Sequence, residues 1–285
     1  MRVFIVANMT RPTVEPFLAE QLSWIKGQVE LVGVDTDCCQ PMDEVEADAV
    51  LVLGGDGTLL GAARRLRGRP IPLMGVNFGR LGFLAAFTPD QFEADFGRLM
   101  RGELPVTPRQ LLRVTVESEG AQRFSSVALN DAVVTAGPPY HLIELVLAIH
   151  GGATGAGSVQ CSGDGVIIST PSGSTAYNLA AGGPIVTAGV DAVAITPVCP
   201  HSLSFRPVVV PMTSTISITP ARVNAGTTLF CDGQDSTPLR VGDKVVIRRA
   251  DHDVLLYENP RSNAWEALAE KLHWALGPHY NHDHG

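Results

Sequence analysis

The chain has no long apolar run. No stretch of its 285 residues approaches the roughly 18 consecutive apolar residues that a membrane-spanning helix needs. The first apolar run, at residues 3–7, is also too short for a secretory signal peptide. We therefore expect a cytoplasmic protein that does not bind membranes.

Paired cysteines are missing as well. The five cysteines are odd in number and contain no C-x-x-C pair: Cys38, Cys39, Cys161, Cys199 and Cys231. This pattern argues against a disulfide framework and is typical of free thiols in a reducing compartment.

Positive charge is in short supply. The sequence has 21 Lys and Arg against 29 Asp and Glu, which gives a formal net charge of −8. This balance argues against nucleic acid or an anionic membrane as the main partner, because no basic field covers the surface. The net charge does not exclude a small anionic ligand, since such a ligand needs only local hydrogen-bond donors.

Apolar residues, in contrast, make up 45% of the chain and charged residues 18%, as in globular proteins. The length favours two domains. Over residues 1–105 the pattern predicts strands at 2–8, 29–34, 48–53 and 71–76 and helices at 13–26, 58–68 and from 88 onward. This alternation predicts a Rossmann-like parallel α/β domain, whose ligands bind at the carboxyl ends of its strands.

Short β-rich runs separated by Gly, Pro, Ser and Asn follow over residues 106–250. We predict strands at 111–118, 123–134, 142–149, 165–169, 192–197, 207–210, 215–219, 227–231 and 244–248, and a helix only at 174–181. Such spacing predicts an antiparallel β domain. In the last segment, 251–285, an apolar stripe predicts a helix over 263–276 that packs back on the α/β domain.

A glycine turn follows the predicted strand 48–53. It reads Gly54, Gly55, Asp56, Gly57, Thr58 and leads into a predicted helix. A strand, a glycine turn and a helix start present free backbone N–H groups to a phosphate. Asp56 would then hold a metal ion or take a proton from an attacking hydroxyl. The alternative is an ordinary tight turn with Asp56 as the helix N-cap.

Two further segments carry polar groups in apolar surroundings. Asn130 and Asp131 stand in the predicted strand 123–134, where they either bind vicinal hydroxyls, as on a ribose, or satisfy a neighbouring loop. Residues 162–177 form a hydroxyl-rich turn before a helix, in which Tyr177 offers a flat face for a base. The alternative there is a Ser/Thr-capped helix with Tyr177 in the core.

Two groups of basic residues are better explained without a catalytic or metal-binding role. The arginines at the end of the predicted helix 58–68 are interpreted as a solvated face that suits the helix dipole: Arg64, Arg65, Arg67 and Arg69. His279, His282 and His284 suggest a metal site, but their position in a terminal tail favours a mobile segment, and we predict no protein metal site.

Taken in order, the motifs resemble those of the NAD kinase family (ATP-NAD kinases of the bacterial type) over essentially the whole chain. They are the glycine turn, Asn77-x-Gly79-x-Leu81-Gly82-Phe83, Asn130-Asp131, Asp164-Gly165, the run 170–177, the run 201–207, and Asp232-Gly233-Gln234. The glycine turn alone also occurs in diacylglycerol and sphingoid-base kinases. The family usually has Asn-Glu where this chain has Asn130-Asp131, a carboxylate one methylene shorter.

The resemblance implies transfer of phosphate to the adenosine-ribose 2′-hydroxyl of NAD, with ATP as the donor and polyphosphate as the alternative donor, and with Mg²⁺ or another divalent cation. It implies Asp56 as general base and a homotetramer or homodimer in which Asp164 reaches a neighbouring subunit. The implied binding residues are Gly55, Gly57, Thr58, Arg80, Phe83, Asn130, Asp131, His141, Asp164, Ser172, Thr175, Ala176, Tyr177 and Gln234. A lipid kinase and a non-catalytic dinucleotide sensor are the alternative functions.

Overall fold

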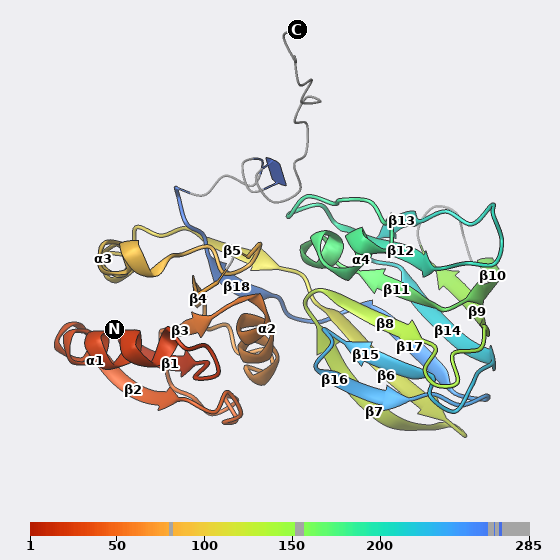
Figure 1. The fold of residues 1–285 in the computed structure, drawn as a ribbon, viewed down its shortest axis with the longest axis horizontal. Helices are drawn as coiled ribbons and strands as arrows, with labels where there is room; N and C mark the ends of the chain where they lie inside the picture. Colours follow the sequence, from red (N-terminus) through yellow and green to blue (C-terminus); the bar gives the residue numbers. More distant parts are fainter. Residues whose placement is uncertain (80–81, 152–156, 262–264, 266–267, 270–285) are drawn as a thin grey trace, which may run out of the picture.

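A six-stranded sheet with helices on both faces forms the first half of the molecule (Figure 1). The computed structural model describes residues 1–79, 82–151, 157–261, 265 and 268–269. Across the sheet the order is β2 (Glu30–Asp35), β1 (Arg2–Ala7), β3 (Ala49–Gly54), β4 (Leu73–Asn77), β18 (Val254–Tyr257) and β5 (Val106–Arg109). Neighbouring strands run parallel except β5, which is antiparallel to β18.

Both faces of this sheet are covered, which is why its central strands are continuously apolar. Val3 and Ile5 of β1 pack toward α1 (Val14–Gln28) and α3 (Phe92–Met100), the latter preceded by the 3-10 turn η1 (Pro89–Gln91). Phe4 and Val6 of the same strand pack on the opposite face, with α2 (Asp56–Arg65). The predicted parallel α/β unit is therefore confirmed.

Two antiparallel sheets packed face to face form the second half. The first has the order β10 (Gly157–Gly163), β9 (Ile143–His150), β14 (Thr215–Arg222), β17 (Lys244–Arg249), β6 (Leu112–Ser118) and β7 (Ala121–Ala128). The second has the order β13 (Val208–Pro211), β12 (Ala192–Val198), β11 (Gly165–Ser169), β8 (Asp131–Thr135), β15 (Thr228–Cys231) and β16 (Asp235–Pro238). One apolar core fills the space between them, and the predicted antiparallel β fold is confirmed.

The predicted single strand 123–134 is wrong. The chain leaves β7 at Ala128 and enters β8 at Asp131, so it crosses from one sheet to the other through Leu129 and Asn130. Strands β5, β10, β16 and β18 were not predicted, because they are short or polar and two of them contain proline. The predicted helix 174–181 is instead η2 (Ser172–Thr175) followed by the one-turn helix α4 (Tyr177–Ala180).

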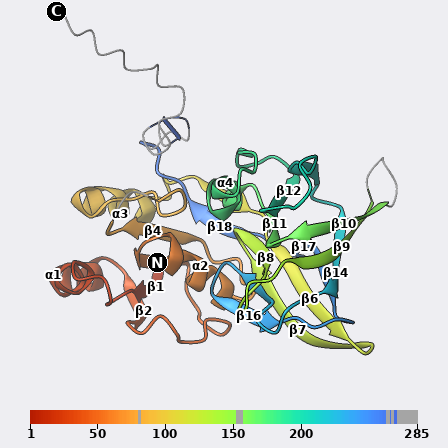
Figure 2. The same ribbon diagram turned by 45° about the vertical axis from the view of Figure 1, so that its right-hand side comes forward.

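The α/β sheet extends past the proposed domain boundaries at 105 and 251, because it includes both β5 and β18. The predicted helix 263–276 lies mostly outside the described residues, although Leu268 is described and is buried. In both views α2 lies on the side of the α/β sheet that faces β8 and β16 (Figure 2). No helix among the described residues is long and apolar enough to cross a membrane.

Candidate active site

The glycine turn joins β3 to α2 at the carboxyl edge of the parallel sheet. Gly55, in extended conformation, is the N-cap of α2, and Asp56 is the first helical residue, so the alternative with Asp56 as N-cap is wrong. A Cβ at Gly54 would lie 2.3 Å from the Thr58 Oγ1, which only glycine avoids. Thr58 in turn accepts a 3.0 Å hydrogen bond from the Asn8 side chain, just beyond β1.

Three backbone N–H groups hold the Asp56 carboxylate. Phe83 N donates to Oδ2 at 2.8 Å, while Leu84 N and Ala85 N donate to Oδ1 at 3.2 and 2.9 Å. These donors come from the loop after β4, and a Cβ at Gly82 would lie 1.8 Å from Asp56 Oδ1. The loop is therefore wrapped directly onto the carboxylate. Arg80, in the same loop, lies outside the described residues.

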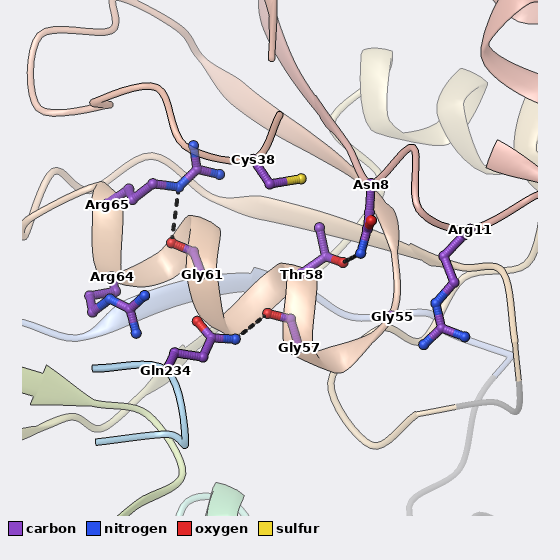
Figure 3. Close-up of a pocket in the computed structure, with 10 residues that line it drawn as sticks. All are labelled: Asn8, Arg11, Cys38, Gly55, Gly57, Thr58, Gly61, Arg64, Arg65 and Gln234. Carbon is purple, nitrogen blue, oxygen red and sulfur yellow. Dashed lines mark hydrogen bonds between the residues drawn. The ribbon is translucent and has the colours of Figure 1, made fainter. Parts of the chain in front are cut away.

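A cavity of about 350 Å³ opens beside this turn, here named the glycine-turn cavity (Figure 3). Gln234, from the β15–β16 hairpin, closes one side by donating from Nε2 to the Gly57 carbonyl at 2.7 Å. The lining residues come from the segments after β1 and β2, from the glycine turn and α2, and from the β15–β16 hairpin: Asn8, Arg11, Cys38, Gly55, Gly57, Thr58, Gly61, Arg64, Arg65 and Gln234. Helix N–H groups and three arginines make this a site for an anion.

Of the arginines interpreted as a solvated face, Arg65 is withdrawn from solvent and Arg64 is half-buried. The Arg65 side chain is 13% exposed and pairs at 2.5 Å with the buried Asp35. Arg64 also lines the cavity, and among the described residues its guanidinium has neither a hydrogen-bond nor an ion-pair partner. That interpretation is therefore wrong for Arg65, whereas it holds for Arg67, which is 74% exposed.

A second cavity of about 400 Å³, the β8 cavity, lies along one face of β8. Alternate residues of the strand, Asp131, Val133 and Thr135, point into it, as the two-residue period of a strand requires. Its other lining residues are Asn130, Ala176, Tyr177, Phe230, Asp232 and Gly233. Tyr177 is 45% exposed and neither η2 nor α4 has a side-chain cap, so the alternative of a capped helix with a core tyrosine is wrong.

Asp232 organises the crossover between β7 and β8. Its carboxylate accepts the backbone N–H groups of Leu129 at 2.9 Å, Asn130 at 2.7 Å and Asp131 at 3.1 Å. The Asn130 Oδ1 is buried without a hydrogen-bond partner among the described residues. A buried amide oxygen left without a donor costs stability. Asn130 therefore combines an unsatisfied acceptor with a place in the wall of the β8 cavity.

Asp131 is buried beside Asp232, and its carboxylate accepts no hydrogen bond from the described residues. Burial, and secondarily the charge of Asp232, raises the pKa of Asp131 to about 7. Burial also raises the pKa of Asp232, but there the three amide donors act in the opposite direction. Asp131 is therefore the member of the pair that is more readily protonated.

We expect Asp131→Asn to stabilise the protein at pH 8 but much less at pH 5. A pKa near 7 in the folded state, against 3.8 when unfolded, means that wild-type stability falls as pH rises from about 4 to 7. The amide does not titrate, so the variant's advantage should grow by about 1–3 kcal/mol over that range. Urea unfolding at both pH values measures it, with the exposed Asp90→Asn as control. An advantage independent of pH would contradict the assignment.

The remaining predicted residues lie in other places. Phe83, Ser172 and Thr175 line a smaller cavity of about 140 Å³ together with Leu268. His141 and Asp164 are exposed and line none of these three cavities. Asp164 precedes Gly165, which pairs with Thr135, whereas Asp131 pairs with Ser169 at the other end of β11. Asp164 thus lies at the far end of the β8 cavity from Asp131.

Sequence reasoning missed several residues that line the two larger cavities. Asn8 carried a usable signal, because it is the first polar residue after a buried strand at the sheet's carboxyl edge. Arg11, Phe230 and the anchoring role of Asp232 carried none, since each reaches its cavity through a fold-dependent contact.

The glycine-turn and β8 cavities adjoin, because Asp232 and Gly233 line one and Gln234 the other. The site thus combines an anion-binding helix N-terminus, a carboxylate in the same turn, and a largely apolar pocket beside it. This combination is that of a phosphoryl-transfer enzyme, a kinase of a small organic substrate. Residues 7–104 match the ATP-NAD kinase N-terminal domain and residues 129–259 the ATP-NAD kinase C-terminal domain. The chain belongs to the NAD kinase family.

Sequence relatives and solved structures support the same family assignment. An NAD kinase from Solibacter usitatus is 38% identical over 282 residues, which cover 95% of this chain and 96% of the relative. An Archaeoglobus fulgidus NAD kinase in complex with ATP has a TM-score of 0.73 and 27% identity, covering 92% of this chain and 95% of its own. Yeast NADH kinase complexed with NADH, at 24% identity, shares the fold with a TM-score of 0.83, over 97% of this chain and 88% of its own.

Proposed function

We propose that this protein transfers the terminal phosphoryl group of ATP to the 2′-hydroxyl of the adenosine ribose of NAD, giving NADP. The observation that carries the proposal is the position of Asp56, in the anion-binding turn of a site whose two cavities adjoin. The glycine-turn cavity would take the phosphates of ATP. The β8 cavity would take the adenosine half of NAD, with Tyr177 and Phe230 against the base.

Asp56 is proposed as the general base. A carboxylate offers about four acceptor positions, and three are filled by backbone N–H groups. Among the described residues Oδ2 accepts a hydrogen bond only from Phe83, which would leave it a position for a substrate hydroxyl. The three fixed donors also prevent the carboxylate from rotating, so the proton acceptor is oriented before the substrate binds.

The divalent cation would arrive as part of the donor. Among the described residues no three His, Cys, Asp or Glu side chains are grouped to hold a metal ion. Mg²⁺ commonly keeps several waters and binds through substrate phosphates rather than through an all-protein cage. The arginines of the glycine-turn cavity would supply the remaining positive charge that phosphoryl transfer requires.

The test is turnover with ATP, Mg²⁺ and either NAD or diacylglycerol. We expect activity with NAD alone, and a product that phosphorus NMR shows to carry phosphate on the adenosine 2′-oxygen and that an NADP-specific dehydrogenase accepts. Phosphate on the 3′-oxygen or the nicotinamide ribose would overturn the assignment of the β8 cavity. Binding without turnover would indicate a dinucleotide sensor, and activity on diacylglycerol a lipid kinase.

We further propose a homo-oligomer, a tetramer or a dimer, in which Asp164 and His141 complete a neighbouring subunit's site. Their exposure, with Asp164 at the far end of the β8 cavity, supports this arrangement. Light scattering of an active preparation at micromolar concentration tests it. A monomer with full activity would show that no residue from a neighbour is essential.

A further inference from the structure

A third cavity, of about 430 Å³, lies at the C-terminal end of α2 and is named here the arginine cavity. Four arginines line it: Arg64, Arg65 and Arg67 from α2 and the residues after it, and Arg113 from β6. His252 and two serines of β7 add hydrogen-bonding groups, and Asp235 is the one carboxylate among the described residues that line it. Both domains thus contribute to its wall.

The positive charge of this cavity is only partly neutralised. Arg65 is committed to the buried Asp35. Arg113 reaches Asp251 at 3.3 Å and Arg67 reaches Asp43 at 3.6 Å, but these carboxylates are 79% and 41% exposed, so water screens both pairs. The guanidinium of Arg64 forms no hydrogen bond or close ion pair with a described residue, but its charge acts on the buried Asp232, where it opposes the rise in pKa that burial causes.

Unpaired donors concentrate on the same side chains. A buried nitrogen without a hydrogen-bond partner occurs on Arg64 (Nη1), Arg65 (Nη2) and Arg113 (Nε). Buried guanidinium nitrogens left without acceptors carry a desolvation penalty. These three nitrogens are buried from solvent and do not themselves face the cavity. Among the described lining residues, however, four arginines stand against one carboxylate, which favours an occupant that carries negative charge.

We propose that the arginine cavity is a second anion-binding site, for a small molecule that carries two or more phosphate or carboxylate groups. Its volume suits a small metabolite rather than a single ion. It is separate from the glycine-turn cavity but shares Arg64 and Arg65 with it. An anion bound here would compete for Arg64, so we expect occupancy of the two cavities to be anticooperative.

Titration calorimetry with inorganic pyrophosphate tests the site through residues that line only the arginine cavity. Arg113→Gln should weaken pyrophosphate binding at least about tenfold, because it removes a charged donor. Asp235→Asn should strengthen it several-fold, because it removes the cavity's one lining carboxylate. Arg240→Gln, which removes an exposed charge elsewhere, should leave it unchanged.

The two cavity variants are expected to change pyrophosphate affinity in opposite directions. Misfolding cannot explain both changes, since a damaged protein would not bind more tightly. If either cavity variant bound pyrophosphate with the affinity of the wild type, the site would be refuted. Equal weakening by Arg113→Gln and Arg240→Gln would refute it too, because it would show only a response to net charge. Neither outcome depends on whether the protein phosphorylates NAD.

Discussion

Asp56→Asn is expected to lower turnover by at least about 100-fold, the usual lower limit for loss of a general base. Its affinity for NAD should stay within several-fold of the wild type, because the β8 cavity does not include Asp56. The amide retains the shape of the carboxylate but cannot accept a proton from the substrate hydroxyl. Steady-state kinetics and NAD titration of the same preparation measure both quantities.

Asp56→Asn also disturbs the hydrogen bonds that hold the loop after β4. In one orientation the new amide NH₂ faces the backbone N–H of Phe83, where Oδ2 now accepts a 2.8 Å hydrogen bond. The loop would shift, and loss of activity could then come from the loop alone. Gly82→Ala separates the two effects, because its Cβ displaces the loop while the carboxylate remains. We expect it to retain more activity than Asp56→Asn, and near-normal turnover of Asp56→Asn would rule out Asp56 as the base.

Local sequence patterns were sufficient to predict the α/β half of the fold. β3 is buried throughout and the glycine turn follows it immediately, so periodicity and glycine content identify both. The geometry on which the proposed phosphate site rests, a helix N-terminus directly after a strand, can be predicted in the same way. These features depend on residues within about ten positions of one another.

The crossover at Leu129 and Asn130 could not be predicted in this way. Its apolar flanks resemble one strand, and what ends the strand is Asp232, 101 to 103 residues further along the chain. The interpretation of Arg65 failed for the same reason, since Asp35, which removes it from solvent, is 30 residues away. Helix position alone says nothing about a partner on another element.

Asp56, in the α/β domain, and Asp232, in the β domain, share one structural role. Each carboxylate accepts three consecutive backbone N–H groups and thereby fixes a loop that lines the site. For Asp56 the loop is the one that carries Phe83; for Asp232 it is the crossover that carries Asn130. Asp232 therefore holds in place the segment that carries Asn130 and Asp131, the residues proposed to bind the ribose.

Asp232→Ala is the second large effect we expect. The variant should be destabilised by about 3 kcal/mol, because three backbone N–H groups lose a charged acceptor while the cost of burying that acceptor is recovered. Its affinity for NAD should fall at least tenfold, since Asn130 and Asp131 are no longer held in position. Urea unfolding measures the first effect, and NAD titration at a temperature where the variant is folded measures the second.

Asp235→Ala is the matched control, because it removes a carboxylate from the same hairpin without touching the crossover. We expect its affinity for NAD to match that of the wild type. If Asp232→Ala were destabilised but bound NAD normally, Asp232 would be a purely structural anchor. The β8 cavity would then not need the crossover held in place, and the assignment of Asn130 to the ribose would lose its physical basis.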